Sequence, residues 1–309
     1  MGRSLVTFAT GVLVVSAIVA CGGNKQPNPS ESLYGQATPT RSPSSTQTAS
    51  PSSTAAAPSA PPSAAPHVFV LVMENTGLSR ALRSPLVARL ASTNVLATNY
   101  HAVSSPSLPN YLALTSGSTW DIADNDYHSL PAQDLGTQLT TAGVSWRAYM
   151  EGMTTAAGCM RSPYPYALKH NPFAYYGGAC PVNVVPIEAL DADLAGAMPT
   201  FSWITPGLCH DGHDCTLEVA GAWLDGTVTR ITSSNAWRTS GVLFIVWDEG
   251  DGGNDLVPLI VLTSDATSSR VETHYDHYSL LATIEDLYGL SRLGAARTAR
   301  PLTPLLGSH

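Results

Sequence analysis

The stretch Pro66-His-Val-Phe-Val-Leu-Val-Met-Glu-Asn75 decides the fold. Its residues 68–73 form an unbroken apolar run that leads directly into a carboxylate and an amide. Such a run predicts a β-strand that is buried on both faces, as in the centre of a parallel sheet. Similar apolar runs recur further along the chain, at 144–150, 201–205, 242–247 and 256–263.

Helical patterns separate these strands. Apolar residues at helical spacing occupy 79–92, 109–116, 135–142, 187–194, 217–233 and 278–287. Strands that alternate with helices predict an α/β fold, here a three-layer sandwich with a mainly parallel central sheet. In such sheets ligands bind beyond the carboxyl ends of the strands, so the residues that follow each strand are the candidates for function.

The N-terminus has the features of an export signal. Arg3 precedes an apolar run at 5–20, which is shorter than the about 20 residues needed to span a bilayer. The run ends in Ile18-Val19-Ala20-Cys21, which resembles the bacterial lipobox. The resemblance implies a signal peptide at 1–20, cleavage before Cys21 and a lipid on its sulfur. The alternative is an ordinary signal peptide followed by an incidental cysteine.

We interpret residues 21–66 as a linker and residues 67–309 as the folded domain. Between 37 and 66, 28 of 30 residues are Pro, Ser, Thr or Ala, which bury too little apolar surface to offset the entropy of ordering. The folded domain carries 12 basic and 22 acidic side chains. This acidic excess argues against binding to nucleic acid. We therefore expect an exported domain on the outer side of the cell membrane, held there only by its lipid; the sequence carries no signal for an oligomeric state.

The cysteines of the folded domain fit an oxidising compartment. There are four of them, Cys159, Cys180, Cys209 and Cys215, and an even number is expected where all form disulfides outside the cytosol. Three pairings are possible, and Cys159–Cys180 with Cys209–Cys215 is favoured because each bond closes a short local loop. The alternative is a zinc site, against which the spacing argues, since no C-x-x-C pair is present.

Carboxylates follow two of the predicted strands. Glu74 and Asn75 come directly after the first strand, and Asp248-Glu249-Gly250 follows the strand at 242–247. Carboxylates at the end of a buried strand are costly to desolvate unless a cation or protons compensate them. An oxygen-rich set of this kind suits a hard or borderline divalent ion. The alternative is a solvated acidic loop, but both pairs fall at one edge of the predicted sheet, which favours a metal site.

A serine lies at the start of the helix predicted at 109–116. In Ser107-Leu-Pro109-Asn110, Pro109 suits the first turn of a helix and leaves Ser107 near the N-cap. A hydroxyl there faces free backbone N–H groups and the positive end of the helix dipole, which suits a phosphoryl group or a metal-bound alkoxide. From the spacing alone, the simpler interpretation is a serine that only caps the helix.

Five short motifs occur in a characteristic order along the chain. They are Glu74-Asn75, Ser107-x-Pro109-Asn110, Thr205-Pro206 with Asp211-Gly-His213-Asp214, Trp247-Asp248-Glu249-Gly250, and Asp276-His277 with Glu285-Asp286. Together they resemble the phosphoesterase family that contains secreted acid phosphatases and non-specific phospholipases C. The resemblance covers about residues 67–290, nearly all of the folded domain. It implies the fold of the alkaline-phosphatase-like superfamily and phosphoryl transfer through a single hydroxyl.

The resemblance also implies roles for individual residues. Ser107 matches the nucleophile, and His213 and His277 match histidines that face the phosphoryl group, either of which would protonate the leaving oxygen. Asp211 and His101 would form a second metal or phosphate site. In the alternative, Asp211, His213 and His277 would bind a second metal ion. The implied ligands of a divalent metal ion are Glu74, Asn75, Asp248 and Glu249. The implied reaction is hydrolysis of a phosphate ester through a phosphoserine intermediate.

The substrate and two rival functions stay open at this point. The chain is shorter than the long phospholipases of that family, which favours a small phosphomonoester over a phospholipid. The aromatic stretch at 163–176 would be either an apolar lip for acyl chains or a packed insert closed by Cys159–Cys180. A serine acylhydrolase would use Ser107, His277 and an aspartate, but the chain has no G-x-S-x-G elbow. The second rival function is that of a non-catalytic lipoprotein that binds a solute. Against it, such a protein would not need a candidate nucleophile together with a cluster of carboxylates and histidines.

Overall fold

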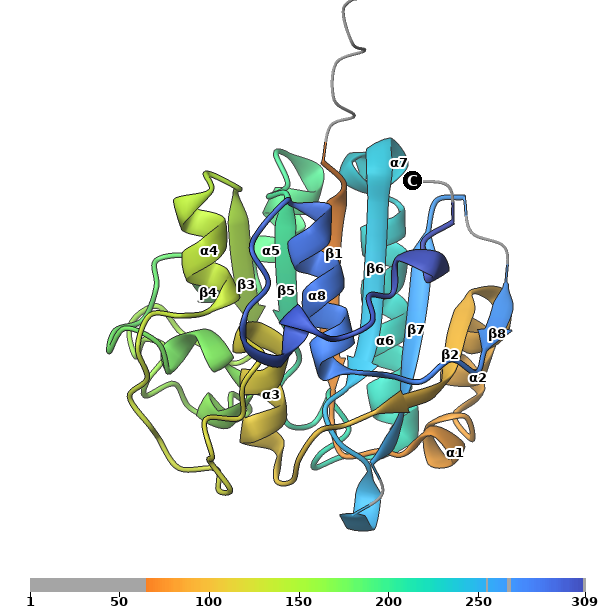
Figure 1. The fold of residues 1–309 in the computed structure, drawn as a ribbon, viewed down its shortest axis with the longest axis horizontal. Helices are drawn as coiled ribbons and strands as arrows, with labels where there is room; N and C mark the ends of the chain where they lie inside the picture. The colour runs from red at the N-terminus through yellow and green to blue at the C-terminus, as the bar shows by residue number, and fades with distance from the viewer. Residues whose placement is uncertain (1–64, 254, 266–267, 308–309) are drawn as a thin grey trace, which may run out of the picture. The chain divides into compact units, whose positions relative to one another are not determined.

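A nine-stranded sheet runs through the computed structural model, which describes residues 65–253, 255–265 and 268–307 (Figure 1). Eight strands lie in the order β4-β3-β5-β1-β6-β7-β2-β8, and β9 pairs with β2. The strands are β1 His67–Met73, β2 Val95–His101, β3 Trp146–Met150, β4 Val184–Pro186, β5 Phe201–Thr205, β6 Gly241–Trp247, β7 Leu256–Thr263, β8 Ser269–Val271 and β9 Tyr275–Asp276.

The sheet is mainly parallel. The central strand β1 has a parallel neighbour on each side, so that Val70 lies opposite Trp203 of β5 and Phe244 of β6. The exception is β7, which runs antiparallel to both β6 and β2. Residues 68–73 are buried on both faces of β1, as the continuous apolar run predicts. The carboxyl ends of β1, β5 and β6 therefore meet at one edge of the sheet.

Helices cover both faces of the sheet. Figure 1 shows α3, α4 and α8 on one face and α2, α5, α6 and α7 on the other. Their bounds are α1 Leu78–Ala81, α2 Pro85–Thr93, α3 Ser107–Ser116, α4 Leu135–Thr141, α5 Ala189–Ala195, α6 Leu217–Thr232, α7 Asn235–Ser240 and α8 His277–Leu287. Every residue of α3 is buried, because α8 and the segment 168–174 pack against it. The predicted three-layer α/β architecture is confirmed.

Two expectations about individual elements are wrong. The single helix predicted at 79–92 is two helices, α1 and α2, because the chain turns at 82–84 and Pro85 begins a new helix. The strand β2 is missing from the prediction because Thr98 and Asn99 interrupt its apolar residues. The ladder between β2 and β7 is also irregular between Ala97 and Tyr100.

Two disulfides close loops of the folded domain. Cys159 pairs with Cys180 and Cys209 with Cys215, with Cα–Cα distances of 6.0 and 4.6 Å. This is the favoured pairing of the three, and it fits an oxidising compartment.

The predicted signal peptide at 1–20, the lipidated Cys21 and the linker up to residue 64 lie outside the described residues. Pro66, at the end of the predicted linker, accepts a hydrogen bond at its carbonyl from the Tyr288 hydroxyl at 3.2 Å. In the part of the chain that the structure describes, no helix has the length and apolar character needed to cross a membrane.

Candidate active site

The Ser107 hydroxyl lies between two carboxylates at the carboxyl edge of the sheet. Ser107 is the first residue of α3 and is 1% exposed. Its Oγ donates toward Glu74 Oε2 and Glu249 Oε1, each at 3.2 Å. The N-cap position of α3 belongs to Pro106, and no side chain caps this helix. The interpretation of Ser107 as a capping serine is therefore wrong, because its hydroxyl faces the carboxylates.

Glu74 is the buried centre of this group. It follows β1 directly, and its backbone N–H donates to the carbonyl of Asp211 at 3.0 Å. Its Oε1 accepts a hydrogen bond from the Tyr111 hydroxyl at 2.6 Å and lies 3.2 Å from Nε2 of His170. Burial alone would raise the pKa of Glu74, but the imidazole of His170 and the Tyr111 hydroxyl outweigh it and hold that pKa below its ordinary value.

His170 lies between two buried carboxylates. Its Nε2 is 3.2 Å from Glu74 Oε1, and its Nδ1 is 3.2 Å from Asp211 Oδ2. Burial lowers the pKa of an imidazole, yet the two carboxylates raise the pKa of His170 above its ordinary value. Burial raises the pKa of Asp211. A protonated imidazole at this position compensates part of the negative charge of both neighbours.

Asp248 and Asn75 form the turn beside Glu74. Asp248 follows β6, its N–H donates to the carbonyl of Met73 at 3.0 Å, and its Oδ1 accepts from the Asn75 N–H at 3.1 Å. Asn75 has a left-handed φ of 43°, which asparagine tolerates better than most residues. Burial and the charges of Glu74 and Glu249 raise the pKa of Asp248 well above its ordinary value. Burial also raises the pKa of Glu249. Burial and mutual repulsion therefore disfavour the ionised form of both carboxyl groups.

The predicted metal ligands fit a hard divalent ion by their chemistry. All four supply oxygen atoms, and two of those atoms, Asn75 Oδ1 and Asp248 Oδ2, are buried without a hydrogen-bond partner. A cation would satisfy these oxygens and relieve the repulsion among the carboxyl groups. Among the described residues, no three or more His, Cys, Asp or Glu side chains are arranged to hold a metal ion. The site thus offers suitable donors but not a complete shell of such ligands.

A cleft of about 380 Å³ opens to solvent above this group, and we call it the mouth. It is lined by Asn75, Arg80, Ser105, residues 212–213 and residues 249–252. The mouth thus connects solvent with Asn75 and Glu249, two of the predicted metal ligands.

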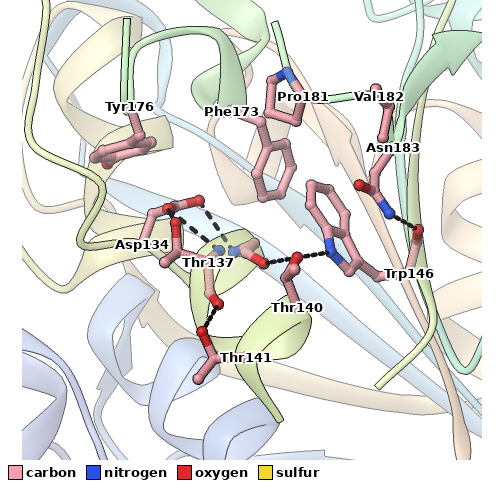
Figure 2. Close-up of a pocket in the computed structure, with 11 residues that line it drawn as sticks. Asp134, Thr137, Thr140, Thr141, Trp146, Phe173, Tyr176, Pro181, Val182 and Asn183 are labelled. Atoms are coloured by element: carbon pink, nitrogen blue, oxygen red, sulfur yellow. Dashed lines mark hydrogen bonds between the residues drawn. The ribbon is translucent and has the colours of Figure 1, made fainter. Parts of the chain in front are cut away.

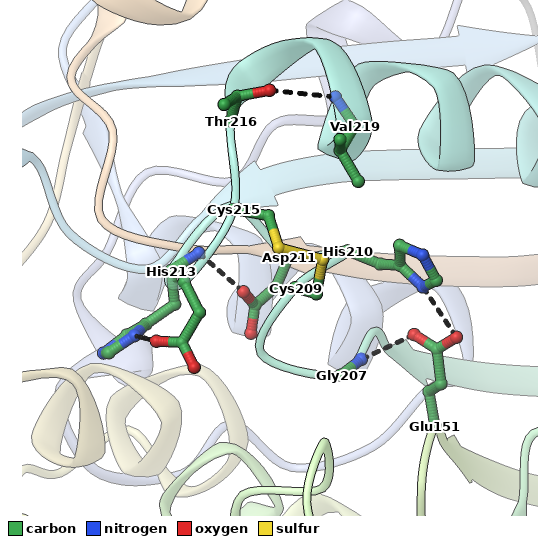
Figure 3. The surroundings of a disulfide bond; sticks show 10 residues. Glu151, Gly207, Cys209, His210, Asp211, His213, Cys215, Thr216 and Val219 are labelled. Carbon is green, nitrogen blue, oxygen red and sulfur yellow. Dashed lines mark hydrogen bonds and ion pairs between the residues drawn. A yellow bond between two sulfur atoms is a disulfide. The ribbon is translucent and has the colours of Figure 1, made fainter.

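His213 lies at the mouth on the loop closed by Cys209–Cys215 (Figure 3). Its backbone N–H donates to Asp211 Oδ1 at 2.7 Å, and its Nδ1 lies 2.7 Å from Asp214 Oδ1. Its Nε2 lies 3.2 Å from Nζ of Lys169. Because Asp214 accepts from the Nδ1–H group, Nε2 carries the lone pair and accepts from the lysine. The structure therefore brings His213 to the mouth together with Lys169.

His277 lies behind Asp248 and does not face the mouth. Its Nε2 donates to the carbonyl oxygen of Asp248 at 2.5 Å, and its Nδ1 accepts from the Tyr100 hydroxyl at 2.9 Å. Burial lowers the pKa of His277 to about 4, so the ring is neutral at physiological pH. Since both ring nitrogens are engaged by the protein, this geometry differs from the expectation that His277 transfers a proton. It supports a role in positioning Asp248.

His101 is not brought together with Asp211. It is the last residue of β2, where its Nε2 lies 2.7 Å from Asn99 Oδ1 and its Nδ1 lies 3.3 Å from Asp255 Oδ2. Its ring stacks on that of His274 with centroids 4.9 Å apart. Asp211 has His170 as its side-chain neighbour instead. Asp211 and His101, which were expected to share a second metal or phosphate site, thus have different neighbours and do not form one.

The aromatic stretch at 163–176 is mostly a packed insert. Its buried members are Tyr166, Phe173, Tyr175 and Tyr176. Phe173 packs against Trp146 with centroids 5.0 Å apart, beside a pocket of about 310 Å³ that none of the predicted site residues lines (Figure 2). Tyr164 is the exception, since it is 63% exposed. The packed insert is confirmed for four of the five aromatic residues.

Three residues that the sequence analysis missed lie at the site: Tyr111, Lys169 and His170. Tyr111 comes four residues after Ser107 in α3, and this spacing, which puts two side chains on one face of a helix, is a signal that could have indicated it. Lys169 and His170 belong to no motif, and only the fold brings their segment beside Glu74 and Asp211.

The fold is similar to that of known enzymes. A protein in the alkaline phosphatase superfamily from Vibrio parahaemolyticus matches with a TM-score of 0.57 at 11% identity, over 77% of this chain and 70% of its own. A 2-O GAG sulfatase matches with a TM-score of 0.54 at 15% identity, over 79% of this chain and 75% of its own. The chain therefore shares the α/β fold of members of the alkaline phosphatase superfamily.

The chain belongs to the Phosphoesterase family, whose family model matches residues 77–291. It is accordingly a hydrolase that acts on phosphate esters. It is 28% identical over 250 residues to a phosphatidylinositol-3-phosphatase of Mycobacterium tuberculosis, covering 78% of this chain and 83% of the relative. It is 28% identical over 242 residues to a phosphate-repressible acid phosphatase of Penicillium chrysogenum, covering 72% of this chain and 58% of the relative. The chain thus spans less than two thirds of that acid phosphatase.

Proposed function

We propose that the chain hydrolyses phosphomonoesters through a phosphoserine at Ser107. The observation that carries this proposal is the position of Ser107 Oγ, 3.2 Å from both Glu74 Oε2 and Glu249 Oε1. A serine hydroxyl is a weak nucleophile until a neighbouring base or metal ion activates it. The acid phosphatase names among the relatives support a monoester as the substrate.

The reaction proceeds in two displacements. In the first, Ser107 Oγ attacks phosphorus, the bond to the ester oxygen breaks, and the hydroxyl proton passes to one of the two carboxylates. His213 donates a proton from Nε2 to the departing oxygen once Lys169 no longer donates to that nitrogen. In the second, water attacks the phosphoserine, His213 accepts a proton from that water, and Ser107 recovers its proton as phosphate leaves. Positioning and electrostatics supply most of the rate, as in other phosphoryl transfers.

The same proposal assigns a divalent metal ion to Glu74, Asn75, Asp248 and Glu249. Buried oxygens without hydrogen-bond partners on Asn75 and Asp248 support this assignment. When bound, the ion lowers the pKa of the serine hydroxyl and offsets negative charge on the phosphoryl oxygens. Elemental analysis of the purified protein tests it: one bound equivalent fits a single site, whereas two equivalents would require ligands beyond these four.

Trapping of the phosphoserine tests the nucleophile. A radiolabelled phosphomonoester is mixed with the enzyme and quenched in acid, which we expect to leave label on the wild-type protein and none on Ser107→Ala. The variant should also lose more than about 10³-fold in kcat/KM. Ser92→Ala, on the exposed surface of α2, is the matched control. Hydrolysis that survives both Ser107→Ala and chelation of metal would contradict the proposal.

A phosphomonoester on a lipid headgroup is a second candidate substrate. The Mycobacterium tuberculosis relative is named a phosphatidylinositol-3-phosphatase. The exposed Tyr164 precedes Pro165, which packs against Gly207 so closely that a Cβ atom there would lie 2.8 Å away. Tyr164 is therefore near the loop that leads to Asp211. Release of phosphate from phosphatidylinositol 3-phosphate in vesicles, compared with its soluble headgroup, tests this candidate; release of diacylglycerol would indicate a phospholipase C instead.

The organisation of the chain is part of the proposal. We assign a lipoprotein signal peptide to 1–20, a lipid to Cys21, a linker to 21–66 and the catalytic domain to 67–309, exposed outside the cell membrane. The lipobox-like sequence and the two disulfides support this assignment. Labelling with a radioactive fatty acid in a bacterial host should mark the wild-type chain, and Cys21→Ser should abolish the label.

A further inference from the structure

Lys169 is a cation near the carboxylates of the candidate active site. It is the only lysine of residues 65–309. Its charge acts on two carboxylates of the site, Glu74 and Glu249. Within the described part of the chain, Lys169 forms no ion pair with a carboxylate, and its ammonium group donates to Nε2 of His213 at 3.2 Å. Its positive charge is therefore available to an anion that enters the mouth.

Both the turn that carries Lys169 and the partner of its ammonium group are held in place. It belongs to the 3₁₀ turn Leu168–His170, whose last residue is buried against Glu74 and Asp211. On its other side, His213 is fixed by Asp214 at Nδ1 and by the backbone bond to Asp211. A lysine with four rotatable side-chain bonds loses much conformational freedom when it binds a ligand. Contacts that order it beforehand reduce that loss, which is typical of a binding residue.

Arg80, a cation in the lining of the mouth, is already compensated. Arg80 lies 3.7 Å from Asp251 across the lining of the mouth, and Asp251 Oδ1 also accepts from the Gly77 N–H at 2.9 Å. The charge of Lys169 acts on Glu74 and Glu249, whose pKa values it lowers against the larger effect of burial. Lys169 thus contacts His213 in the lining of the mouth and acts by its charge on the carboxylates beside Ser107. Among the described residues it has no carboxylate partner of its own.

Phosphomonoesters and phosphodiesters differ in charge, and this difference determines which of them a lysine binds more strongly. A phosphomonoester dianion has three non-bridging oxygens and a second negative charge, whereas a diester has two such oxygens and one charge. Negative carboxylates around Ser107 repel the second charge, so a pocket that accepts the dianion needs a further positive group. A hydrogen bond between two charged groups is about twice as strong as one between neutral groups.

We propose that Lys169 binds the third non-bridging oxygen of a phosphomonoester dianion and thereby makes the pocket selective for monoesters over diesters. The proposal rests on the phosphomonoesterase function proposed above. Lys169 is then a substrate-binding residue, which His213 and Asp214 position in the free enzyme. When Lys169 turns to the substrate, Nε2 of His213 is free for the proton transfer assigned to it.

Paired substrates with one leaving group test this proposal. We would measure kcat/KM for p-nitrophenyl phosphate and for bis(p-nitrophenyl) phosphate with wild-type enzyme, Lys169→Met and Lys169→Arg. Lys169→Met should lower the value for the monoester about 10- to 100-fold, as expected for one lost charge-assisted hydrogen bond, and that for the diester less than about 3-fold. Lys169→Arg should restore most of the monoester activity. The inhibition constant of inorganic phosphate should rise with Lys169→Met in parallel.

A matched control and two outcomes make the test decisive. Arg230→Met is the control, because it removes a cation from the last turn of α6, where Arg230 pairs with Asp191. It should leave kcat/KM unchanged for both substrates. Equal losses on both substrates, or no loss on the monoester, would overturn the role of Lys169 while leaving the phosphomonoesterase in place. Wild-type enzyme that cleaves neither ester would instead overturn the proposed function. Thermal melting of each variant separates these results from misfolding.

Discussion

Two sides of the candidate active site are held in place by different means. On the strand side, Glu74 and Asp248 follow β1 and β6, which pair along their whole lengths. On the loop side, Asp211 and His170 belong to loops that disulfides close, Cys209–Cys215 and Cys159–Cys180. The strand side is fixed by ladder hydrogen bonds and burial on both faces of the sheet. The loop side depends on cross-links and on packing between loops.

The charges of the two sides complement each other. The strand side contributes Glu74, Asp248 and Glu249, whose mutual repulsion and burial keep the pKa values of Asp248 and Glu249 high. The loop side contributes His170 and Lys169, which lie beside those carboxylates. We infer that the strand side contacts the nucleophile Ser107 and holds the metal ion, and that the loop side compensates charge and recognises substrate. Such a division predicts different responses to mutation on each side.

The largest effect on activity is expected from Asp248→Asn on the strand side. Asparagine retains the Oδ1 acceptor of the Asn75 N–H but removes a negative charge from the proposed metal site. We expect kcat/KM for a phosphomonoester to fall more than about 10³-fold. The melting temperature should rise or stay unchanged, because a buried carboxyl that repels Glu74 and Glu249 is gone.

Asp255→Asn is the control for that variant, since Asp255 lies on the same connection between β6 and β7 but is mostly exposed. Its kcat/KM should stay within about twofold of the wild-type value. Asp248→Asn enzyme that keeps a tenth of wild-type activity would show that the strand side does not carry the chemistry.

Removal of each disulfide compares the two loops directly. Replacing Cys209 and Cys215 by alanine frees the six-residue span that carries Asp211 and His213, and we expect a loss of about 10- to 100-fold in kcat/KM because both side chains lose their alignment. Replacing Cys159 and Cys180 should cost less activity, because His170 and Phe173 stay buried in their own packing.

Stability should follow the opposite order. Chain entropy assigns about 2 kcal/mol to the shorter loop and about 3 kcal/mol to the longer one. Denaturant unfolding and steady-state kinetics of both double variants measure the two quantities. If the longer loop proved the more important one for activity, the loop side would depend on the segment of Lys169 and His170 more than on the Cys209–Cys215 loop.

The strand side was predictable from the sequence, and much of the loop side was not. An apolar run that ends in Glu74-Asn75 or Asp248-Glu249 predicts a buried strand. It also predicts where the polar residues lie, because parallel strands end at a common edge of the sheet. His170 follows no strand and belongs to no motif. Its place depends on the path of the chain between Cys159 and Cys180, which packs Phe173 and Tyr175 in the core. His277 shows the converse: its motif was recognised, but only packing reveals that it lies behind Asp248.

A smaller effect is expected from Tyr111→Phe, which acts on Glu74 from within α3. The substitution removes the 2.6 Å hydrogen bond to Glu74 Oε1 while Ser107 and His170 keep their contacts with Glu74. We expect kcat to fall about 5-fold, since one hydrogen bond of about 1 kcal/mol orients the carboxylate. Tyr127→Phe, at an exposed tyrosine, serves as the control. A loss as large as that of Asp248→Asn would mean that Tyr111 itself contacts the substrate.

The smallest effect on activity, none, is expected from Glu285→Gln, which removes a buried carboxyl outside the pocket. Glu285 lies in α8, where its Oε1 accepts from the Leu293 N–H at 2.7 Å and its Oε2 has no hydrogen-bond partner. Burial raises its pKa from 4.5 to about 8. The folded state therefore binds this proton more tightly than the unfolded state, so wild-type stability is highest below about pH 4.5 and declines as the pH rises to about 8.

Glutamine cannot ionise, so the Glu285→Gln variant should lack that decline. Its free energy of unfolding should exceed that of the wild type by up to about 5 kcal/mol near pH 9 and match it near pH 4, as denaturant unfolding at both values would show. Equal stability at pH 9 would mean that the carboxyl ionises without cost. The comparison matters for the strand side, because burial raises the pKa of both Asp248 and Glu285. If only the Asp248 substitution abolishes catalysis, a buried carboxyl is not enough for function. The function then depends on the position of Asp248 beside Asn75, Glu74 and Glu249.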